Sequence, residues 1–176
     1  MPVLLALRAL HNRFFALFER ALEPWFLGLA ARLLFAGVLF GYYWRSATTK
    51  IGDGLLGLFT IADGAYWQMF GEATLAEYGY DASRLPFFPY DVVAAAGTYA
   101  EFLLPALIVL GLATRLAALG MIVFVLVQSW VDVTVHALDA ASVGALFDRL
   151  PGSAIWDQRA LWIFLLAHLV VKGAGL

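Results

Sequence analysis

The chain has 176 residues, of which 63% are hydrophobic and 14% are charged, and its mean hydropathy is +0.84. A water-soluble domain carries about 25% charged residues, and this chain folded in water would expose large apolar patches, so we predict a membrane protein. The net charge of −2 excludes a basic footprint for nucleic acid, and the lack of cysteine excludes disulfides, thiolate nucleophiles and CxxC redox pairs.

Residues 1–24 are predicted to form an amphipathic helix that lies on the membrane surface and ends at Pro24. Leucine and phenylalanine cover much of the helical wheel. A cleaved signal peptide is not expected, because the first residues carry no basic side chain and no small-x-small site follows. Burial of the helix against a partner subunit is the alternative. The polar face consists of Arg8, His11, Asn12, Glu19 and Glu23.

Four windows are apolar enough to cross a bilayer, which takes about 20 residues. The predicted spans cover residues 25–46, 92–112, 116–135 and 155–172. Only Gly111 to Arg115 join the second span to the third, so these two are expected to form an antiparallel hairpin. The fold is therefore predicted to be all-α, with a four-helix antiparallel membrane bundle over residues 25–176.

The loop at residues 49–90 is not a polar linker, because it mixes apolar residues with glycines and many aromatic side chains. Tryptophan and tyrosine collect at membrane–water boundaries. We expect short helices or a re-entrant turn that lie over the outer mouth of the bundle as a cap, since irregular backbone at depth must be covered by protein or water.

The distribution of basic residues predicts that both termini are cytoplasmic. Lysine and arginine are denser on the side of the termini, whereas the other side spreads Lys50, Arg84 and Arg149 over two longer loops. The basic residues on the side of the termini are Arg8, Arg13, Arg20, Arg115 and Lys172.

Four polar residues inside the predicted spans are candidates for function: Glu101, Gln128, Arg32 and His168. Helical rise places Glu101 and Gln128 near the bilayer midplane, where a carboxylate should face the interior. Glu101 is either a proton-relay or ligand-binding group, or a hydrogen-bond partner of Gln128 or a tyrosine. Arg32 is expected to snorkel to the cytoplasmic headgroups or to pair with Glu101 or His168. His168 alone is interpreted as a packed interior histidine.

At the outer end of the third span, Asp132, His136 and Asp139 are spaced i, i+4, i+7, which places them on one helical face. An imidazole between carboxylates could bind a transition metal or a quinone carbonyl, or shuttle protons. The alternative is a solvated helix end, and no metal site is assigned because no second histidine is near in sequence. Gly37 and Gly41 suit close approach of another helix.

The stretch AEFLLPALIVLGLATRLAAL, from Ala100 to Leu119, resembles the signature of DoxX-family membrane proteins. In that family an acidic residue in the second helix precedes an apolar LGL/F-x-T-R turn and an apolar third helix. The resemblance extends to RLLFAG in the first span, to the lysine after it and to the terminal VKGAGL. The matching motif positions are Arg32, Lys50, Glu101, Thr114 and Arg115.

This resemblance implies a multi-pass protein of the bacterial inner membrane. Some relatives are subunits of quinone-linked oxidoreductases, such as thiosulfate:quinone oxidoreductase, and others are linked to oxidative-stress assemblies. We therefore expect an accessory subunit that has no catalytic activity of its own and works with a redox partner. A bound quinone and a homo-oligomer are both compatible with the sequence.

Two other function classes stay open. One is a small-solute transporter or channel that uses Glu101, and the other is a structural scaffold. A water-accessible path that touches Glu101 would favour transport, whereas an aromatic slot that faces lipid would favour quinone.

Overall fold

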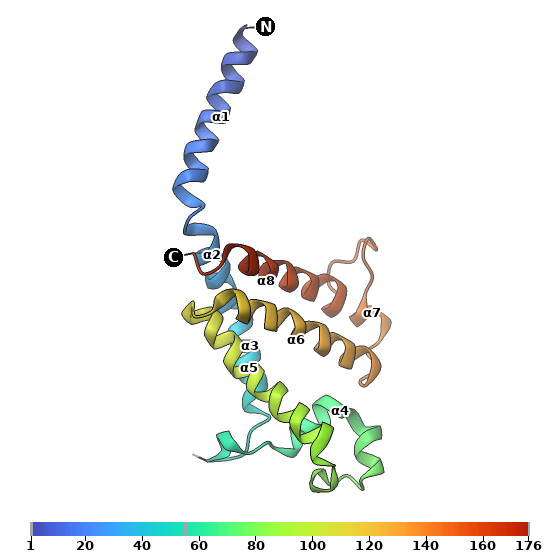
Figure 1. Ribbon diagram of the computed structural model, residues 1–176. Helices are drawn as coiled ribbons and strands as arrows, with labels where there is room; N and C mark the ends of the chain where they lie inside the picture. The colour runs from blue at the N-terminus through green and yellow to red at the C-terminus, as the bar shows by residue number, and fades with distance from the viewer. Residues whose placement is uncertain (1, 55, 176) are drawn as a thin grey trace.

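The computed structural model describes residues 2–54 and 56–175, and over those residues the chain is helical with no β-strand (Figure 1). Four helices are long and apolar enough to cross a membrane: Phe26–Thr48, Phe87–Leu110, Thr114–Thr134 and Ala154–Lys172. The predicted all-α fold with a four-helix membrane bundle is confirmed.

The first span consists of α2 (Phe26–Phe35), a π-helical turn η1 (Ala36–Phe40) and α3 (Gly41–Thr48). Its buried residues are spaced four apart. In a regular helix with 3.6 residues per turn, residues spaced four apart move gradually around the helix and away from the core. The π-helical turn, which has more residues per turn, compensates for this rotation. The buried stripe is Ala31, Phe35, Leu39, Tyr43 and Ala47.

The second and third spans form the expected hairpin. A π-helical turn, η4 (Phe87–Asp91), leads into α5 (Val92–Leu110), so this span begins earlier than the predicted residue 92. Gly111, with φ of +78°, ends α5 in the left-handed conformation that favours glycine. After this turn α6 (Thr114–Thr134) runs back along the bundle.

The buried residues of α5 alternate at spacings of four and three, the pattern of helices that pack at a shallow angle. They are Ala94, Thr98, Glu101, Pro105 and Ile108. Glu101 is thus part of the face that α5 turns to the interior.

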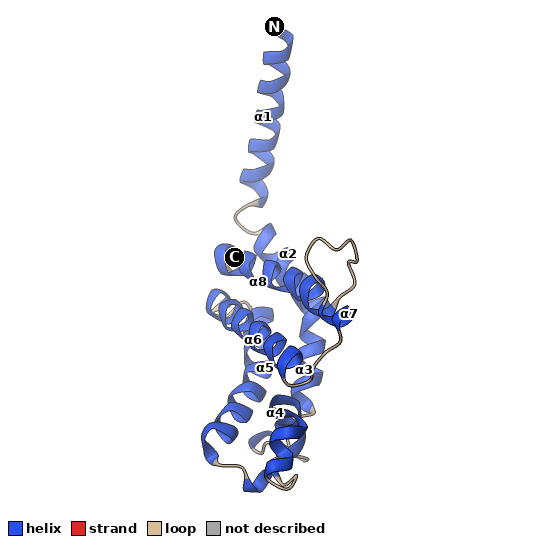
Figure 2. Cartoon of the chain, turned by 90° about the vertical axis from the view of Figure 1, so that its right-hand side faces the viewer, coloured by secondary structure: helices blue, strands red, loops and turns tan. Residues whose placement is uncertain are grey.

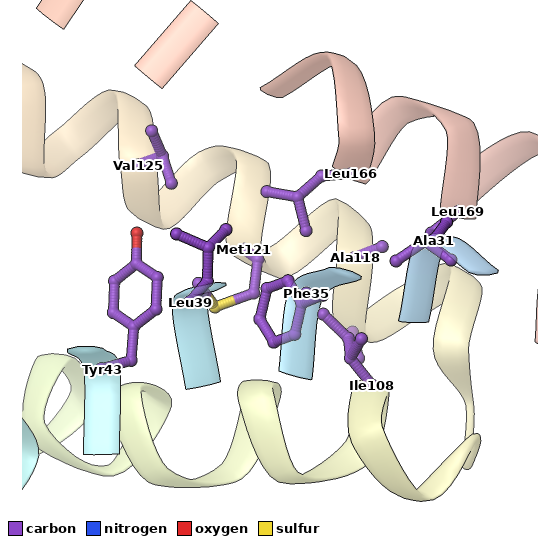
Figure 3. Packing of buried hydrophobic residues seen from close by; sticks show 11 residues of the cluster. Ala31, Phe35, Leu39, Tyr43, Ile108, Ala118, Met121, Val125, Leu166 and Leu169 are labelled. Atoms are coloured by element: carbon purple, nitrogen blue, oxygen red, sulfur yellow. The ribbon is translucent and has the colours of Figure 1, made fainter. Parts of the chain in front are cut away.

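The fourth span consists of η5 (Ala154–Arg159) and α8 (Ala160–Lys172), and α8 packs against α6 and α2. The main core lies between these spans, mostly toward the hairpin turn (Figure 3). Its buried members are Ala31, Phe35, Leu39, Tyr43, Ile108, Ala117, Ala118, Met121, Val125, Leu166 and Leu169.

The loop over residues 49–90 contains the short helices that the sequence predicts: η2 (Gly57–Phe59), α4 (Asp63–Glu77) and η3 (Ala82–Arg84). Gly71 bends α4 with φ of +74°, and a Cβ there would collide with Val135 at the end of α6. A second apolar cluster joins α4 to α5 through Tyr66, Leu75 and Ala94. The other loop on this side carries only α7 (Ala140–Val143) among its described residues.

The N-terminal helix α1 (Pro2–Leu22) extends away from the bundle in both views (Figures 1 and 2). It ends just before Glu23 and Pro24, as expected for a proline that cannot continue a helix. Lys172 of α8 lies 2.7 Å from Glu23 and donates a hydrogen bond that lowers the pKa of this carboxyl group. The location of α1 at the membrane surface stays a prediction.

Candidate functional site

A buried ion pair joins the end of the first span to the middle of the second. The Nζ atom of Lys50 lies 2.7 Å from Oε2 of Glu101 and 2.6 Å from Oγ of Ser46. The Ser46 hydroxyl donates in turn to Oε1 of Glu101 at 3.3 Å. The side chains of Lys50 and Glu101 are only 4% and 6% exposed, so the two charges are shielded from the surroundings.

Glu101 faces the interior as expected, but the prediction of its partner was wrong. The carboxylate pairs with Lys50, and neither Gln128 nor a tyrosine contacts it. Lys50 follows α3 by two residues, so its long side chain can reach back to Ser46 one turn earlier and across to α5. The predicted span ended at residue 46 and left Lys50 in the outer loop.

Gln128 forms a second polar pair near the ion pair. Its Nε2 donates to the hydroxyl of Tyr42 at 2.9 Å, which connects α6 to α3. Its Oε1 is buried and has no hydrogen-bond partner among the described residues. A buried acceptor without a donor is costly, so this atom is a position where a ligand or water would be stabilised.

A cavity of about 930 Å³ lies between α3, α5, α6 and α4, and both polar pairs line it. Figure 1 shows α5 and α6 diverging from their common turn, and residues of both helices line the cavity. Its walls are mostly apolar. The lining comprises Tyr42, Ser46, Lys50, Gln68, Met69, Phe70, Thr74, Pro89, Tyr90, Val93, Ala96, Gly97, Ala100, Glu101, Leu104, Gly120, Val123, Phe124, Val127, Gln128, Trp130, Val131, Asp132, Val135 and His136.

The cavity is closed at both ends and open at one side. Toward the hairpin turn, a Cβ at Gly120 would lie 3.1 Å from Leu104, so α5 and α6 are in contact there. At the other end α4 covers the cavity, and Nε2 of His136 lies 2.8 Å from the Gln68 carbonyl oxygen. Lining residues Val93 and Val127 are 44% and 54% exposed, so the cavity is open at the side of the bundle where these two residues lie.

Tyr66 and Asp91 attach the cap to the start of the second span. The Tyr66 hydroxyl donates to Oδ1 of Asp91 at 2.7 Å. Burial, followed by this hydrogen bond, raises the pKa of Tyr66 from 10.0 to about 12. The phenol is therefore held in its neutral, donating form.

Of the three outer-face candidates, Asp132 and His136 line the cavity with different partners, and Asp139 lies outside it. Asp132 pairs with Arg159 of η5 at 2.5 Å, and His136 contacts Gln68. Asp139 instead caps α7, where backbone and side-chain hydrogen bonds from Ser142 lower the pKa of its carboxyl group. The i, i+4, i+7 interpretation was wrong because α6 ends at Thr134. The described residues contain no cluster suited to a metal ion.

Arg32 adopts neither of the two arrangements expected for it. Its guanidinium donates to the carbonyl oxygens of Ile108 and Val109 at 3.0 and 2.7 Å and to that of Ala174 at 3.1 Å. The Ile108 and Val109 carbonyls lie in the last turn of α5. Backbone acceptors at a helix C-terminus lack the usual intrahelical donors, and a cation is favoured there. Arg32 thus joins the first span to the hairpin turn and the C-terminal segment.

The remaining motif positions lie near Arg32. Thr114 is buried at the start of α6, and its hydroxyl has no partner among the described residues. The Arg115 side chain passes close to Gly173. His168 is half-buried on α8 and makes no hydrogen bond within the described part of the chain, so it is less enclosed than predicted.

Gly37 and Gly41 do not mediate helix packing within the chain. A Cβ at either position would meet no atom within 4 Å. The close helix approach expected at this GVLFG segment is therefore absent from the described part of this single chain.

In comparisons with known proteins, the chain matches no family model, no curated protein and no solved structure. The chemistry of the site follows from its own residues. A volume of about 930 Å³ is in the upper part of the range of roughly 300–1,000 Å³ for small-molecule sites, which are mostly apolar with a few placed polar groups.

Proposed function

We propose that this chain is an accessory subunit of a quinone-linked membrane redox system, as its resemblance to the DoxX family implies. The observation that carries this proposal is the cavity. It combines apolar walls, a side opening toward lipid and a polar region around Glu101, Lys50 and Gln128. A membrane quinone has the same division into a polar ring and an apolar tail.

The residues present fit such a ligand. Buried Oε1 of Gln128 lacks a partner, and Phe124 and Trp130 supply aromatic surface on the same wall. A bound quinone would supply the two-electron redox chemistry, while the chain would bind its ring and exclude water from it. The chain has no cysteine for redox chemistry of its own, so the electrons would be exchanged with a partner subunit.

Transport of a solute is supported less well by the same geometry. A path across the membrane would have to continue from Glu101 toward the hairpin turn. The contact between Leu104 and Gly120 closes the cavity on that side, and the apolar core with Ile108 and Met121 lies beyond it. The cavity therefore has the form of a binding site with one mouth.

We further propose that the protein belongs to a bacterial inner membrane with both termini in the cytoplasm, so that the cap lies on the outer side. Single cysteines at Ser83 of the cap and Asn12 of α1 test this, since both positions are exposed and the chain has no other cysteine. An impermeant thiol reagent should label Ser83→Cys but not Asn12→Cys in intact cells. The reverse pattern would refute the orientation.

Ligand binding is tested by purifying the full chain in mild detergent and identifying the proteins, lipids and quinones that co-purify. Val127→Trp fills the opening of the cavity, whereas Leu126→Trp is a matched control on the same helix. Both residues are 54% exposed, but only Val127 lines the cavity. Quinone should co-purify with the parent and Leu126→Trp and be depleted from Val127→Trp. Equal quinone in both variants, or none in the parent, would contradict the proposal.

A further inference from the structure

The polar groups that line the cavity differ sharply in how many hydrogen bonds they still have to offer. Lys50 has three N–H donors, and all three are directed at acceptors of the chain: Oε2 of Glu101, Oγ of Ser46 and the Ser46 carbonyl oxygen. Although Lys50 is the only cationic residue that lines the cavity, it has no donor left for a ligand.

The acceptors, by contrast, are only partly used. The Glu101 carboxylate has about four lone-pair positions and receives two hydrogen bonds, from Lys50 and from Ser46. Asp132 receives a side-chain hydrogen bond from Arg159 on Oδ2, which leaves Oδ1 without a side-chain donor in the described part of the chain. Both residues line the cavity.

His136 adds a further acceptor. Its Nε2 faces the carbonyl oxygen of Gln68, which can only accept, so Nε2 must carry the proton. In the neutral ring the lone pair is then on Nδ1. The lining therefore presents acceptors from both α5 and α6.

The lining also has side-chain donors, on Tyr42, on the second Nε2 hydrogen of Gln128, and on Thr74, Tyr90 and Trp130. The Tyr42 hydroxyl accepts from Gln128, so its own hydrogen is available, and Oε1 of Gln128 is one more acceptor without a partner. Exchanging the two ends of the Gln128 amide would let Tyr42 donate to Oε1 and would free Nε2. Either orientation leaves two donors on this pair, whereas the ion pair itself offers a ligand only the acceptor positions of Glu101.

We infer that the cavity selects a headgroup that donates hydrogen bonds, and hence binds a quinol more tightly than the corresponding quinone. This inference rests on the proposed function and specifies the redox form of its ligand. A quinol presents two O–H donors to the acceptors of the cavity, whereas a quinone presents two carbonyl acceptors. A carbonyl placed against the Glu101 carboxylate brings two acceptors together with no donor between them, so the carbonyl oxygen loses its hydrogen bond to water without replacement.

The test compares the two forms on the full chain in nanodiscs, with empty nanodiscs as background. The probe is a benzoquinone with a ten-carbon tail and its two-electron-reduced hydroquinone. A potentiometric titration gives the midpoint potential of the bound couple relative to the free couple. Preferential binding of the reduced form raises that potential by about 30 mV for each tenfold difference in affinity, and we expect a tenfold difference or more.

Two variants and one control test whether the shift in midpoint potential comes from the groups of the cavity or from a general effect of the membrane. Tyr42→Phe removes one hydroxyl donor, so it should weaken quinone binding and keep the positive shift. Tyr99→Phe is the matched control because its hydroxyl bonds the Leu58 carbonyl oxygen and Tyr99 does not line the cavity. Glu101→Gln replaces a carboxylate with a donor-bearing amide and should reduce the shift.

Each result decides between the two proposals. A bound couple with an unchanged or more negative potential would overturn the quinol preference and leave quinone binding standing. A positive shift that is the same in Glu101→Gln would overturn its origin in the acceptors of Glu101. Failure of both redox forms to bind above the empty-nanodisc background would instead refute the proposed function.

Discussion

Replacing Glu101 with leucine is expected to destabilise the bundle by about 3–5 kcal/mol, the cost of leaving one member of a buried ion pair without its partner. The Lys50 ammonium would then keep only the acceptors of Ser46 in a position where its side chain is 4% exposed. Glu101→Gln keeps the shape and one acceptor oxygen for Lys50, so its cost should be smaller, about 1–3 kcal/mol.

Removal of both charges should restore most of the stability. At the 2.7 Å separation of Nζ and Oε2, an effective dielectric constant of 20 gives an attraction of about 6 kcal/mol. Desolvation of the two ions costs several kcal/mol each, so attraction and desolvation nearly cancel. The double variant Lys50→Met, Glu101→Leu is therefore expected to lie within about 2 kcal/mol of the parent.

The measurement is SDS-driven unfolding in mixed micelles, followed by circular dichroism, for the parent, both single variants and the double variant. The resulting double-mutant cycle should give a coupling energy of at least about 3 kcal/mol. The buried ion pair would be refuted if Glu101→Leu were as stable as the parent. It would also be refuted if the double variant lost as much free energy of unfolding as the two single variants lose in sum.

Three further predictions can be checked with purified protein. Arg32→Lys should cost about 1–3 kcal/mol in the same unfolding assay, because an ammonium cannot reproduce the planar fork that reaches Ile108, Val109 and Ala174; stability equal to the parent would contradict this role. Gly111→Ala should cost about 1–3 kcal/mol, because Gly111 has a φ of +78° and an added Cβ would lie 2.8 Å from Arg32. Gly37→Ala should be neutral or stabilising, since a Cβ there meets no atom within 4 Å; equal costs for the two variants would argue against the turn geometry. The Tyr66 phenol should titrate near pH 12, against 10.0 when unperturbed, in the ultraviolet difference between the parent and Tyr66→Phe. Its contribution to cap stability is then complete below pH 10 and is lost as the pH rises through 12; titration at 10 would show that the phenol is neither buried nor bonded to Asp91 as the structure has it.

The spans could be predicted from sequence because length and apolar composition determine which segments can cross a bilayer. The π-helical turn η1 could not. Its signal is the four-residue spacing of Phe35, Leu39 and Tyr43, and this spacing becomes informative only when these residues are known to be buried together. The same applies to the bend of α4 at Gly71, which depends on the approach of Val135 from a distant helix.

The candidate site was predicted in part. Membrane depth alone indicated an interior position for Glu101, and the structure places it with Thr98 and Pro105 on the buried face of α5. Its partner was missed because Lys50 lies beyond the apolar window, and windows of hydropathy do not register how far a lysine side chain can reach. The Lys50 match in the family resemblance was the signal that could have identified the pair.

The positions that carry the family resemblance divide between two ends of one wedge, and this division bears on function. Arg32 binds the backbone of the hairpin turn, next to the place where α5 and α6 are in closest contact. Lys50 and Glu101 pair where these helices have moved apart. The guanidinium joins the end of α5 to the first span and to the C-terminal segment, so it fixes the end of α5 near the hairpin turn against the rest of the bundle. The motif positions therefore support the proposed side-opening cavity, with Lys50 and Glu101 in its lining and Arg32 holding the end of α5 outside it.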